Sequence, residues 1–295
     1  MRAPIGCVPI VWNNADLTDL GPVVPFAEIL DAYAELGYDG TQHGIGFPEG
    51  EALAGELHRR GLRFAELYSA LAAGPDGLAP GAADIARRDL ARVIVARGEV
   101  LNLALDGGGI RDRWSGRVSD ATPRWPAAAY DELAALLREL SGAAPNGIRV
   151  TFHPHTATWI EAPDEVDALA ARLPGTGAGL CLDTGHHLVG GGDPVAALRD
   201  YGDLVTHVHL KDVDPAVLAR LRAGELHGFA QAIHERIFTE LGNGVLDLDG
   251  VLRALDARDF EGWLMVEQDS SWVPPVEAAD IGRRAVAGAL ARLAG

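Results

Sequence analysis

The stretch from Ala178 to Asp212 reads AGLCLDTGHHLVGGGDPVAALRDYGDLVTHVHLKD, and it holds two short apolar runs with a helical pattern between them. The runs Ala178–Asp183 and Leu204–Leu210 have the length and composition of buried strands, while Pro194–Tyr201 has helical spacing. A strand, a helix and a second strand in this order indicate a βα unit of a parallel sheet. Each apolar run is also followed by polar side chains that can carry chemistry.

The same alternation runs along the whole chain. Eight apolar runs of strand length occur in order, at Ile5–Val11, Tyr38–Gln42, Arg63–Tyr68, Val100–Leu105, Ile148–His153, Ala178–Asp183, Leu204–Leu210 and Gly262–Glu267. Helical patterns lie between and after them, at Phe26–Leu36, Glu51–Arg60, Ala83–Arg97, Ala127–Leu140, Pro163–Leu173, Pro194–Tyr201, Val251–Ala257 and Val276–Leu293. Eight βα units predict a (β/α)8 TIM barrel that spans residues 1–295 as a single domain. A doubly wound sheet is the alternative, and it usually needs fewer units.

The chain is acidic, with 42 Asp and Glu against 25 Lys and Arg and a net charge of −17. Nucleic-acid binding depends on basic side chains that neutralise phosphates, so we expect no nucleic-acid partner and no anionic membrane surface. No apolar run approaches the roughly 18 residues of a membrane span, and the N-terminus has no signal-peptide pattern. We therefore expect a cytoplasmic protein. A homo-oligomer is neither required nor excluded.

One long irregular segment, Asp106–Pro126, follows the fourth strand and so belongs to the carboxyl-terminal face of the predicted barrel. We interpret it as a candidate lid. Its glycines at 107–109 do not match a phosphate-binding loop, and the glycine-rich run 175–179 precedes a strand where a dinucleotide site would follow one. The sequence therefore does not favour a nucleotide cofactor.

Functional side chains of such barrels lie at or just beyond the C-terminal ends of the strands. Strands five to eight end in FHPH (152–155), LDTGHH (182–187), HVHLKD (207–212) and VEQD (266–269). Side chains two apart on a strand share a face, so His153 or His155 can point to the barrel mouth, and so can His207 or His209. Four neighbouring strands would then bring their polar ends to one point.

Asp183, Glu267 and one imidazole from each histidine pair would make a mixed set of nitrogen and oxygen ligands. Such a set suits Mn²⁺, Co²⁺, Fe²⁺ or Zn²⁺ better than Ca²⁺, and its open positions can take a substrate. A single histidine of this kind is more often a hydrogen-bonded core or rim residue. The recurrence at four successive strand ends favours a metal centre.

Weaker signals lie at other strand ends. Trp12 and Asn13 follow the first strand and offer a stacking surface and an amide to a polyol, although an aromatic side chain there is as often packing. Gln42 after strand two and Glu66 on strand three can reach the same cavity, and a solvated or helix-paired carboxylate is an equal interpretation of Glu66. Lys211, the only lysine, lies just past strand seven, so we expect its ammonium group in the cavity.

At these residues the chain resembles the xylose-isomerase-like TIM barrels, which include divalent-metal sugar isomerases, epimerases and endonuclease IV, and within them the inosose dehydratases. The motifs that carry the resemblance are Pro9–Leu17, Leu36–Thr41 with Phe47-Pro48, His153–His155, Leu182–His186, Gly191–Pro194, His207–Asp212, Phe238–Gly244 and Gly262–Asp269. They span nearly the whole chain in order. After the second strand the chain departs from the dehydratase pattern, because it reads Thr41-Gln42-His43-Gly44 where a glutamate is usual.

The resemblance implies that Asp183, His209 and Glu267 ligate a divalent metal and that His153 occupies the fourth ligand position. Mn²⁺ or Co²⁺ is the expected ion, with Zn²⁺, Fe²⁺ and Mg²⁺ as alternatives. The sugar epimerases place a glutamate where His153 lies. Replacing that carboxylate by an imidazole removes one of two opposed bases, which favours elimination over epimerisation.

We therefore expect a lyase that dehydrates a keto-polyol such as 2-keto-myo-inositol through an enolate. Glu267 or Lys211 is the expected base, and His186 is the expected acid for the leaving hydroxyl. The expected substrate contacts are Trp12, Asn13, Gln42, His155 and His186. A divalent-metal sugar isomerase or epimerase is one alternative, and a catalytically inactive polyol-binding barrel is another.

Overall fold

The computed structural model describes residues 3–14, 17, 21–269 and 272–294; Ala15 and Asp16 of the first motif lie outside the described residues. Eight strands form the barrel: β1 (Ile5–Cys7), β2 (Gly40–Gln42), β3 (Arg63–Leu71), β6 (Val100–Leu105), β7 (Arg149–Phe152), β8 (Gly179–Asp183), β9 (Val205–Leu210) and β12 (Leu264–Val266). They close in the order β1-β12-β9-β8-β7-β6-β3-β2, and every neighbouring pair is parallel. The predicted (β/α)8 barrel is therefore confirmed, with all eight strands within or close to their expected ranges.

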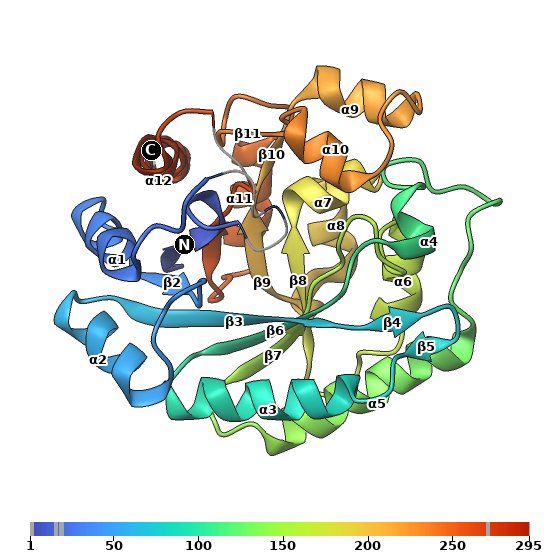
Figure 1. Cartoon of the computed structure of the whole chain (residues 1–295), viewed down its shortest axis with the longest axis horizontal. Helices are drawn as coiled ribbons and strands as arrows, with labels where there is room; N and C mark the ends of the chain where they lie inside the picture. The colour runs from blue at the N-terminus through green and yellow to red at the C-terminus, as the bar shows by residue number, and fades with distance from the viewer. Residues whose placement is uncertain (1–2, 15–16, 18–20, 270–271, 295) are drawn as a thin grey trace.

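Helices surround this barrel (Figure 1). Those that follow the barrel strands are α1 (Phe26–Glu35), α2 (Gly50–Arg59), α3 (Ala82–Val95), α5 (Ala127–Ala143), α6 (Pro163–Ala170), α8 (Pro194–Tyr201), α11 (Leu248–Asp256) and α12 (Pro275–Ala294). Each buries one apolar face; α11, for example, buries Leu248, Val251, Leu252 and Leu255, which recur at helical spacing. None of the helices within the described ranges has the length and hydrophobicity that crossing a membrane requires.

The first predicted strand, Ile5–Val11, is too long. The strand ends at Cys7, and Pro9–Val11 forms a 3-10 turn, because Pro9 has no N–H to donate and its fixed φ suits the first position of a helix. The sequence also missed the short helix α7 (Thr184–Val189). This helix starts directly at the end of β8 because the side chain of Asp183 accepts a hydrogen bond from the backbone N–H of His186.

Further elements that the sequence did not predict lie in the connections between the barrel strands and helices. They are β4 (Ala73–Gly74), β5 (Gly77–Leu78), α4 (Gly109–Asp112), the 3-10 turn Gly202–Leu204, β10 (Asp212–Val213), α9 (Pro215–Arg222), α10 (Phe229–His234) and β11 (Phe238–Thr239). The strands β10 and β11 pair antiparallel, and Figure 1 shows them beside α9 and α10 at one edge of the barrel. This insertion follows β9 and adds a wall next to the barrel mouth.

The segment 106–126 contains α4 and is packed against the chain that follows β7. Arg111 is 1% exposed, and its guanidinium makes two contacts of 2.8 Å with the carboxylate of Glu165. The carboxylate of Glu161 accepts a hydrogen bond from the backbone N–H of Gly116. The lid role expected for this segment stays a prediction.

The barrel interior changes from apolar to polar along the strand direction. Trp263 and Met265 fill its amino-terminal end, where Gly40 leaves the space, since a Cβ there would lie 2.7 Å from the Trp263 ring. Inward-facing positions recur every second residue, so Met265 is followed on the same face by Glu267. The polar side chains of the neighbouring strands therefore gather at the carboxyl-terminal end, and His209 is among them.

Candidate metal centre

Four side chains from successive barrel strands converge at the carboxyl-terminal end of the interior. His153 follows β7, Asp183 ends β8, His209 lies on β9 and Glu267 follows β12. One ligand-type atom of each lies within 4.8 Å of the others. The strand register produces this arrangement, because Asp183 pairs with His209 and His209 pairs with Met265, two residues before Glu267. The structure thus brings together the four residues expected to bind metal.

The donor atoms of this cluster have the surroundings of a cation site. His153 Nε2 lies 3.5 Å from Asp183 Oδ2, and the two side chains are 2% and 0% exposed. Neither ring nitrogen of His153 nor Oδ2 of Asp183 has a hydrogen-bond partner among the described residues. Buried polar atoms left without partners are costly, and a divalent ion between them would satisfy them. The residues present therefore fit a divalent metal.

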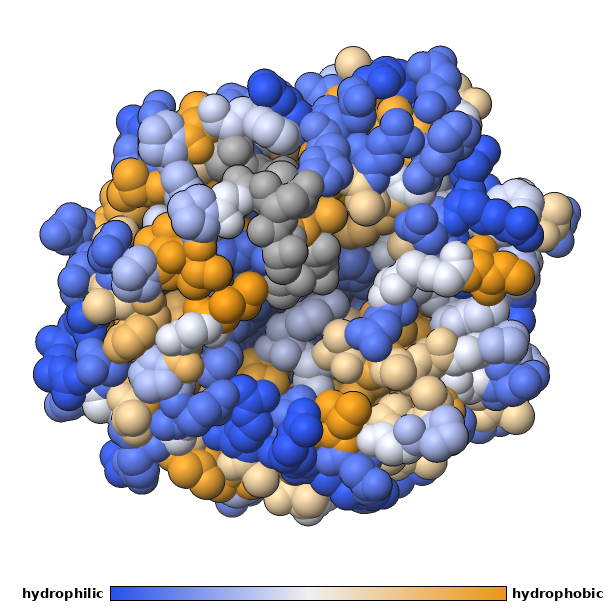
Figure 2. All heavy atoms as spheres, viewed as in Figure 1, coloured by the Kyte–Doolittle hydropathy of each residue, from blue (hydrophilic) through white to orange (hydrophobic). Residues whose placement is uncertain are grey.

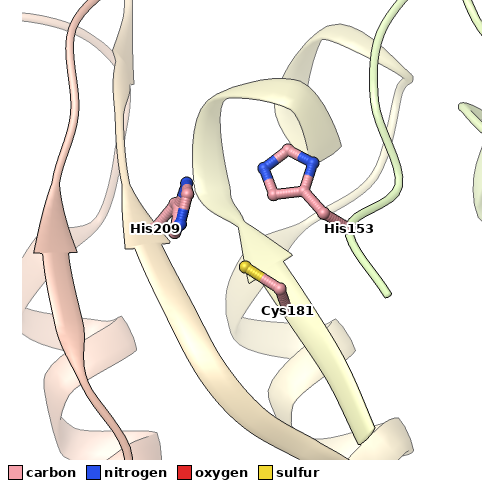
Figure 3. Close-up of side chains that lie close together, drawn as sticks. All are labelled: His153, Cys181 and His209. Carbon is pink, nitrogen blue, oxygen red and sulfur yellow. The ribbon is translucent and has the colours of Figure 1, made fainter. Parts of the chain in front are cut away.

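A second set of possible ligands shares two members of the cluster. Figure 3 shows the rings of His153 and His209 close together, with the sulfur of Cys181 deeper on β8. Burial raises the pKa of the Cys181 thiol to about 11, which keeps it neutral. Glu267 lines a cavity that reaches the cluster, whereas Cys181 does not line it. Since an ion must be open to substrate to act on it, the carboxylate set is the better candidate.

Lys211 is buried among the carboxylates of this centre and is 1% exposed. Its Nζ lies 2.6 Å from Asp269 Oδ1, 3.4 Å from Asp183 Oδ2 and 3.4 Å from Glu267 Oε1. Burial opposes the charge, but these three carboxylates together raise the pKa of Lys211 above its ordinary value. Lys211 is therefore a fixed cation, which does not suit it to act as a base.

His186 lies behind His155 rather than in the cavity. The two rings pack with centroids 3.7 Å apart and planes tilted by 39°, and His155, but not His186, lines the cavity. His186 Nε2 lies 3.0 Å from Lys211 Nζ, so it accepts a hydrogen bond, and Nδ1 lies 2.9 Å from Thr156 Oγ1. Burial, His155 and Lys211 hold the pKa of His186 well below its ordinary value. The neutral ring of His186 positions Lys211. This arrangement disfavours the role of acid that was expected for His186.

A cavity of about 380 Å³ opens above the cluster. Figure 2 shows a hollow near the centre of the molecular face that Figure 1 presents. The described residues that line the cavity include Asn13, Gln42, His43, Glu49, Tyr68, His153, His155, Glu267 and Asp269, and none of them is lysine or arginine.

Of the other expected substrate contacts, Gln42 and His155 line this cavity. Asn13 lines it too, but its amide exchanges hydrogen bonds with the backbone of Val24 at 2.9 and 2.8 Å. The ring of Trp12 packs edge-on against Tyr33, 5.1 Å between centroids, and Trp12 lines a neighbouring hollow. Trp12 thus packs against Tyr33, and its expected contact with a polyol stays a prediction.

Sequence reasoning missed part of the polar interior. Asn102, with a side chain fully buried in the barrel, donates a hydrogen bond to Glu66, and Thr151 donates one to Asn102. Asn102 had a signal, since it is the one polar residue in the apolar run Val100–Leu105. Asp269 had one as well, because it lies two residues beyond Glu267 and so on the same side of the strand end.

The fold and this cluster define a (β/α)8 enzyme whose centre is suited to a divalent metal. The chain belongs to the family described as xylose isomerase-like TIM barrel, whose model matches residues 23–288. The resemblance expected from the motifs is thereby confirmed.

Two relatives and one solved structure illustrate the similarity. The chain is 31% identical over 283 residues to an inosose dehydratase of Geobacillus thermodenitrificans, covering 94% of each chain. It is 33% identical over 299 residues to the rhizopine catabolism protein MocC of Rhizobium meliloti, covering 97% of this chain and 88% of that one. The IolI protein with a bound zinc atom has a TM-score of 0.70 at 14% identity and 98% coverage of both chains, a likeness of fold.

Proposed function

We propose that this protein is a divalent-metal lyase that removes water from a neutral keto-polyol such as 2-keto-myo-inositol. The observation that carries the proposal is the cluster of His153, Asp183, His209 and Glu267, of which His153 and Glu267 line a cavity with no lysine or arginine among its described residues. The inosose dehydratases similar to this chain support the same reaction class. A divalent ion bound there would act as a Lewis acid toward a substrate carbonyl.

Within this proposal, Glu267 takes the α-proton of the substrate. Glu267 is the one carboxylate of the cluster among the described residues that line the cavity. The ammonium group of Lys211 lies 3.4 Å from its Oε1. Burial raises the pKa of Glu267, but Lys211 and His209 more than offset this and lower the pKa below its ordinary value. Glu267 is thus ionised and able to accept a proton, whereas Lys211 is not.

Asp269 is the group that we propose as proton donor to the leaving hydroxyl. It lines the same cavity as Glu267, and burial, opposed by Lys211 Nζ 2.6 Å from its Oδ1, raises the pKa of Asp269 to about 7, so it can hold a proton. The α-proton goes to Glu267, the β-hydroxyl leaves as water with the proton of Asp269, and the resulting enol tautomerises to a diketone. The contact of Lys211 with His186 on its other side holds the ammonium group in place.

The distribution of carboxylates favours elimination over epimerisation. The described carboxylates that line the cavity are Glu49, Glu267 and Asp269. Glu267 and Asp269 come from one strand end, and Glu49 is held by Arg92 at 2.6 Å. The other strand ends that line the cavity offer Gln42, Tyr68 and the two imidazoles of His153 and His155, none of which is a carboxylate. Epimerisation needs bases on both faces of a carbon. In this cavity the two described carboxylates that are not held by an arginine, Glu267 and Asp269, come from one strand end.

The cavity also favours an uncharged substrate. A phosphate or carboxylate group would meet Glu267 and Asp269 without a guanidinium or ammonium group to pair with at the described surface. We therefore propose a neutral keto-polyol, and not a sugar phosphate, as substrate.

Manganese or cobalt is the ion that we propose, because a set of two imidazoles and two carboxylates suits both, with zinc, iron and magnesium as competitors. The cytoplasmic location and the lack of a nucleic-acid partner stay predictions from the sequence.

A substrate panel tests the proposal. The Mn²⁺- or Co²⁺-loaded protein is incubated with 2-keto-myo-inositol, neutral ketoses and phosphorylated ketoses, and loss of water is followed with Glu267→Gln as control. We expect dehydration of the neutral cyclic ketone alone and none with the variant. Interconversion of ketoses without loss of water would instead support the isomerase alternative. A protein that binds no metal and converts nothing would support the inactive binding barrel.

A further inference from the structure

Glu66 lies on β3 inside the barrel, beneath the metal centre, and its side chain is fully buried. Its Oε2 accepts a hydrogen bond from Asn102 Nδ2 at 2.8 Å and lies 2.9 Å from His207 Nε2. Its Oε1 lies 2.8 Å from His209 Nε2. The interpretation of Glu66 as a solvated carboxylate is therefore wrong.

The orientation of this carboxylate is fixed from two neighbouring strands. Thr151 Oγ1, on β7, donates a hydrogen bond to Asn102 Oδ1 at 2.9 Å. This bond sets the amide of Asn102, on β6, so that its NH₂ group points to Glu66. These hydrogen bonds fix the Glu66 carboxylate in one orientation.

The two ring nitrogens of His209 have different surroundings. Nδ1 faces the metal centre, in contact with Glu267 Oε2 and 3.8 Å from Asp183 Oδ2. Nε2 lies 2.8 Å from Glu66 Oε1, at ion-pair distance, and 3.4 Å from Asn102 Nδ2. We propose that Glu66 is a positioning residue for His209: it keeps the ring proton on Nε2 and thereby leaves the lone pair of Nδ1 for the ion. Carboxylates that accept from the second nitrogen of a metal-binding histidine fix both its tautomer and its ring orientation. The inference rests on the proposed metal centre.

The same side chains could instead form a second cation site, because ligand-type atoms of Glu66, His207 and His209 also lie within 4.8 Å of one another. Two observations favour the positioning role. Oε2 of Glu66 is already engaged by Asn102 and His207, and neither Glu66 nor His207 is among the described residues that line the large cavity. The number of ions bound per chain distinguishes the two arrangements.

The test combines a metal titration with a spectrum. Glu66→Gln presents an amide NH₂ to His209 Nε2 and so favours the tautomer with its proton on Nδ1. We expect the Kd for Co²⁺, measured by calorimetry, to rise by roughly 10–100-fold, with one ion per chain in the wild type. Ser69→Ala is the matched control, because Ser69 is a buried polar residue of the same strand whose hydroxyl donates to Asp89, away from the centre. Its Co²⁺ affinity should equal that of the wild type.

The tautomer itself is measured on the wild type, so that a variant that does not fold leaves the inference testable. In a long-range ¹H–¹⁵N spectrum of the Zn²⁺-loaded protein, we expect the proton of His209 on Nε2. A proton on Nδ1, an unchanged Co²⁺ affinity in Glu66→Gln, or two ions per chain of which this variant loses one would each overturn the inference. A wild type that binds neither Co²⁺ nor Zn²⁺ would instead refute the proposed metal centre.

Discussion

Lys211 Nζ lies 2.6 Å from Asp269 Oδ1, and the two side chains are only 1% and 2% exposed. This pair places the only lysine of the sequence at the centre of three acidic groups, with Asp183 and Glu267 as the others. Without the ammonium group, the carboxylates would repel one another in a largely buried region.

Lys211→Met should therefore destabilise the metal-free protein strongly. Removing one partner of a buried ion pair typically costs about 3–5 kcal/mol, since the remaining charges lose their compensation. The matched control is Arg97→Met, which removes an exposed pair with Glu51 and should cost about 0–1 kcal/mol. Urea denaturation measures both. Equal, small losses for the two variants would mean that Lys211 does not neutralise the centre.

Asp269→Asn should separate the two halves of the proposed reaction. Glu267 remains able to take the α-proton, so the substrate should still exchange that proton with solvent deuterium, while loss of water falls by the roughly 10²–10⁴-fold that a general acid contributes. Mass spectrometry of the substrate and product follows both processes. If Asp269→Asn dehydrates as fast as the wild type, another group donates the proton.

Asp183→Asn should abolish tight Co²⁺ binding, because an amide replaces a buried carboxylate whose Oδ2 has no hydrogen-bond partner among the described residues. Cys181→Ser, two residues earlier on the same strand, should bind Co²⁺ as the wild type does. Calorimetric titration of both variants decides between the two ligand sets. Loss of binding in Cys181→Ser would identify the thiolate set of His153, Cys181 and His209 instead.

Glu161 should make the stability of the fold depend on pH. Burial outweighs its two backbone N–H donors and raises its pKa from the ordinary 4.5 to about 7. Folding therefore takes up a proton, and the contribution of Glu161 to the free energy of unfolding is present below pH 4.5 and is lost as the pH rises through about 7.

The change Glu161→Gln removes this titration, so the curve of unfolding free energy against pH should be flatter than that of the wild type across that window. Each pKa unit corresponds to about 1.4 kcal/mol, which sets the scale of the difference. Glu225→Gln, at an exposed ion pair with Arg220, should leave the slope unchanged. Parallel curves for Glu161→Gln and the wild type would show that Glu161 does not titrate in this window.

The barrel was predictable because its eight strands recur as apolar runs, each with a helical pattern after it. The candidate ligands were predictable for a related reason: the period of two in a strand places His209 and Glu267 on the inward face at a strand end. The insertion 212–239 was not predicted, because its strands have only two residues each. Tertiary contacts stabilise them, such as the hydrogen bonds that Asp212 accepts from the backbone N–H groups of Gly242 and Gly244.

The roles of charged side chains were harder to read from the sequence. Lys211 was expected in the cavity, but its state depends on three carboxylates that come from β8 and the end of β12. His186 was expected as an acid from its ordinary pKa, and its burial beside Lys211 makes that charge state unfavourable. Both outcomes follow from contacts between strands, which a single sequence does not display.

We propose that the metal-loaded cavity eliminates water from a neutral cyclic ketone after taking its α-proton. The most direct measurement incubates the Mn²⁺-loaded protein with 2-keto-myo-inositol in D₂O and follows substrate and product by mass spectrometry. We predict a product that has lost one water and carries solvent deuterium, and no product in Glu267→Gln. Deuterium exchange into the ketone without loss of water, by a protein with its metal bound, would contradict the account.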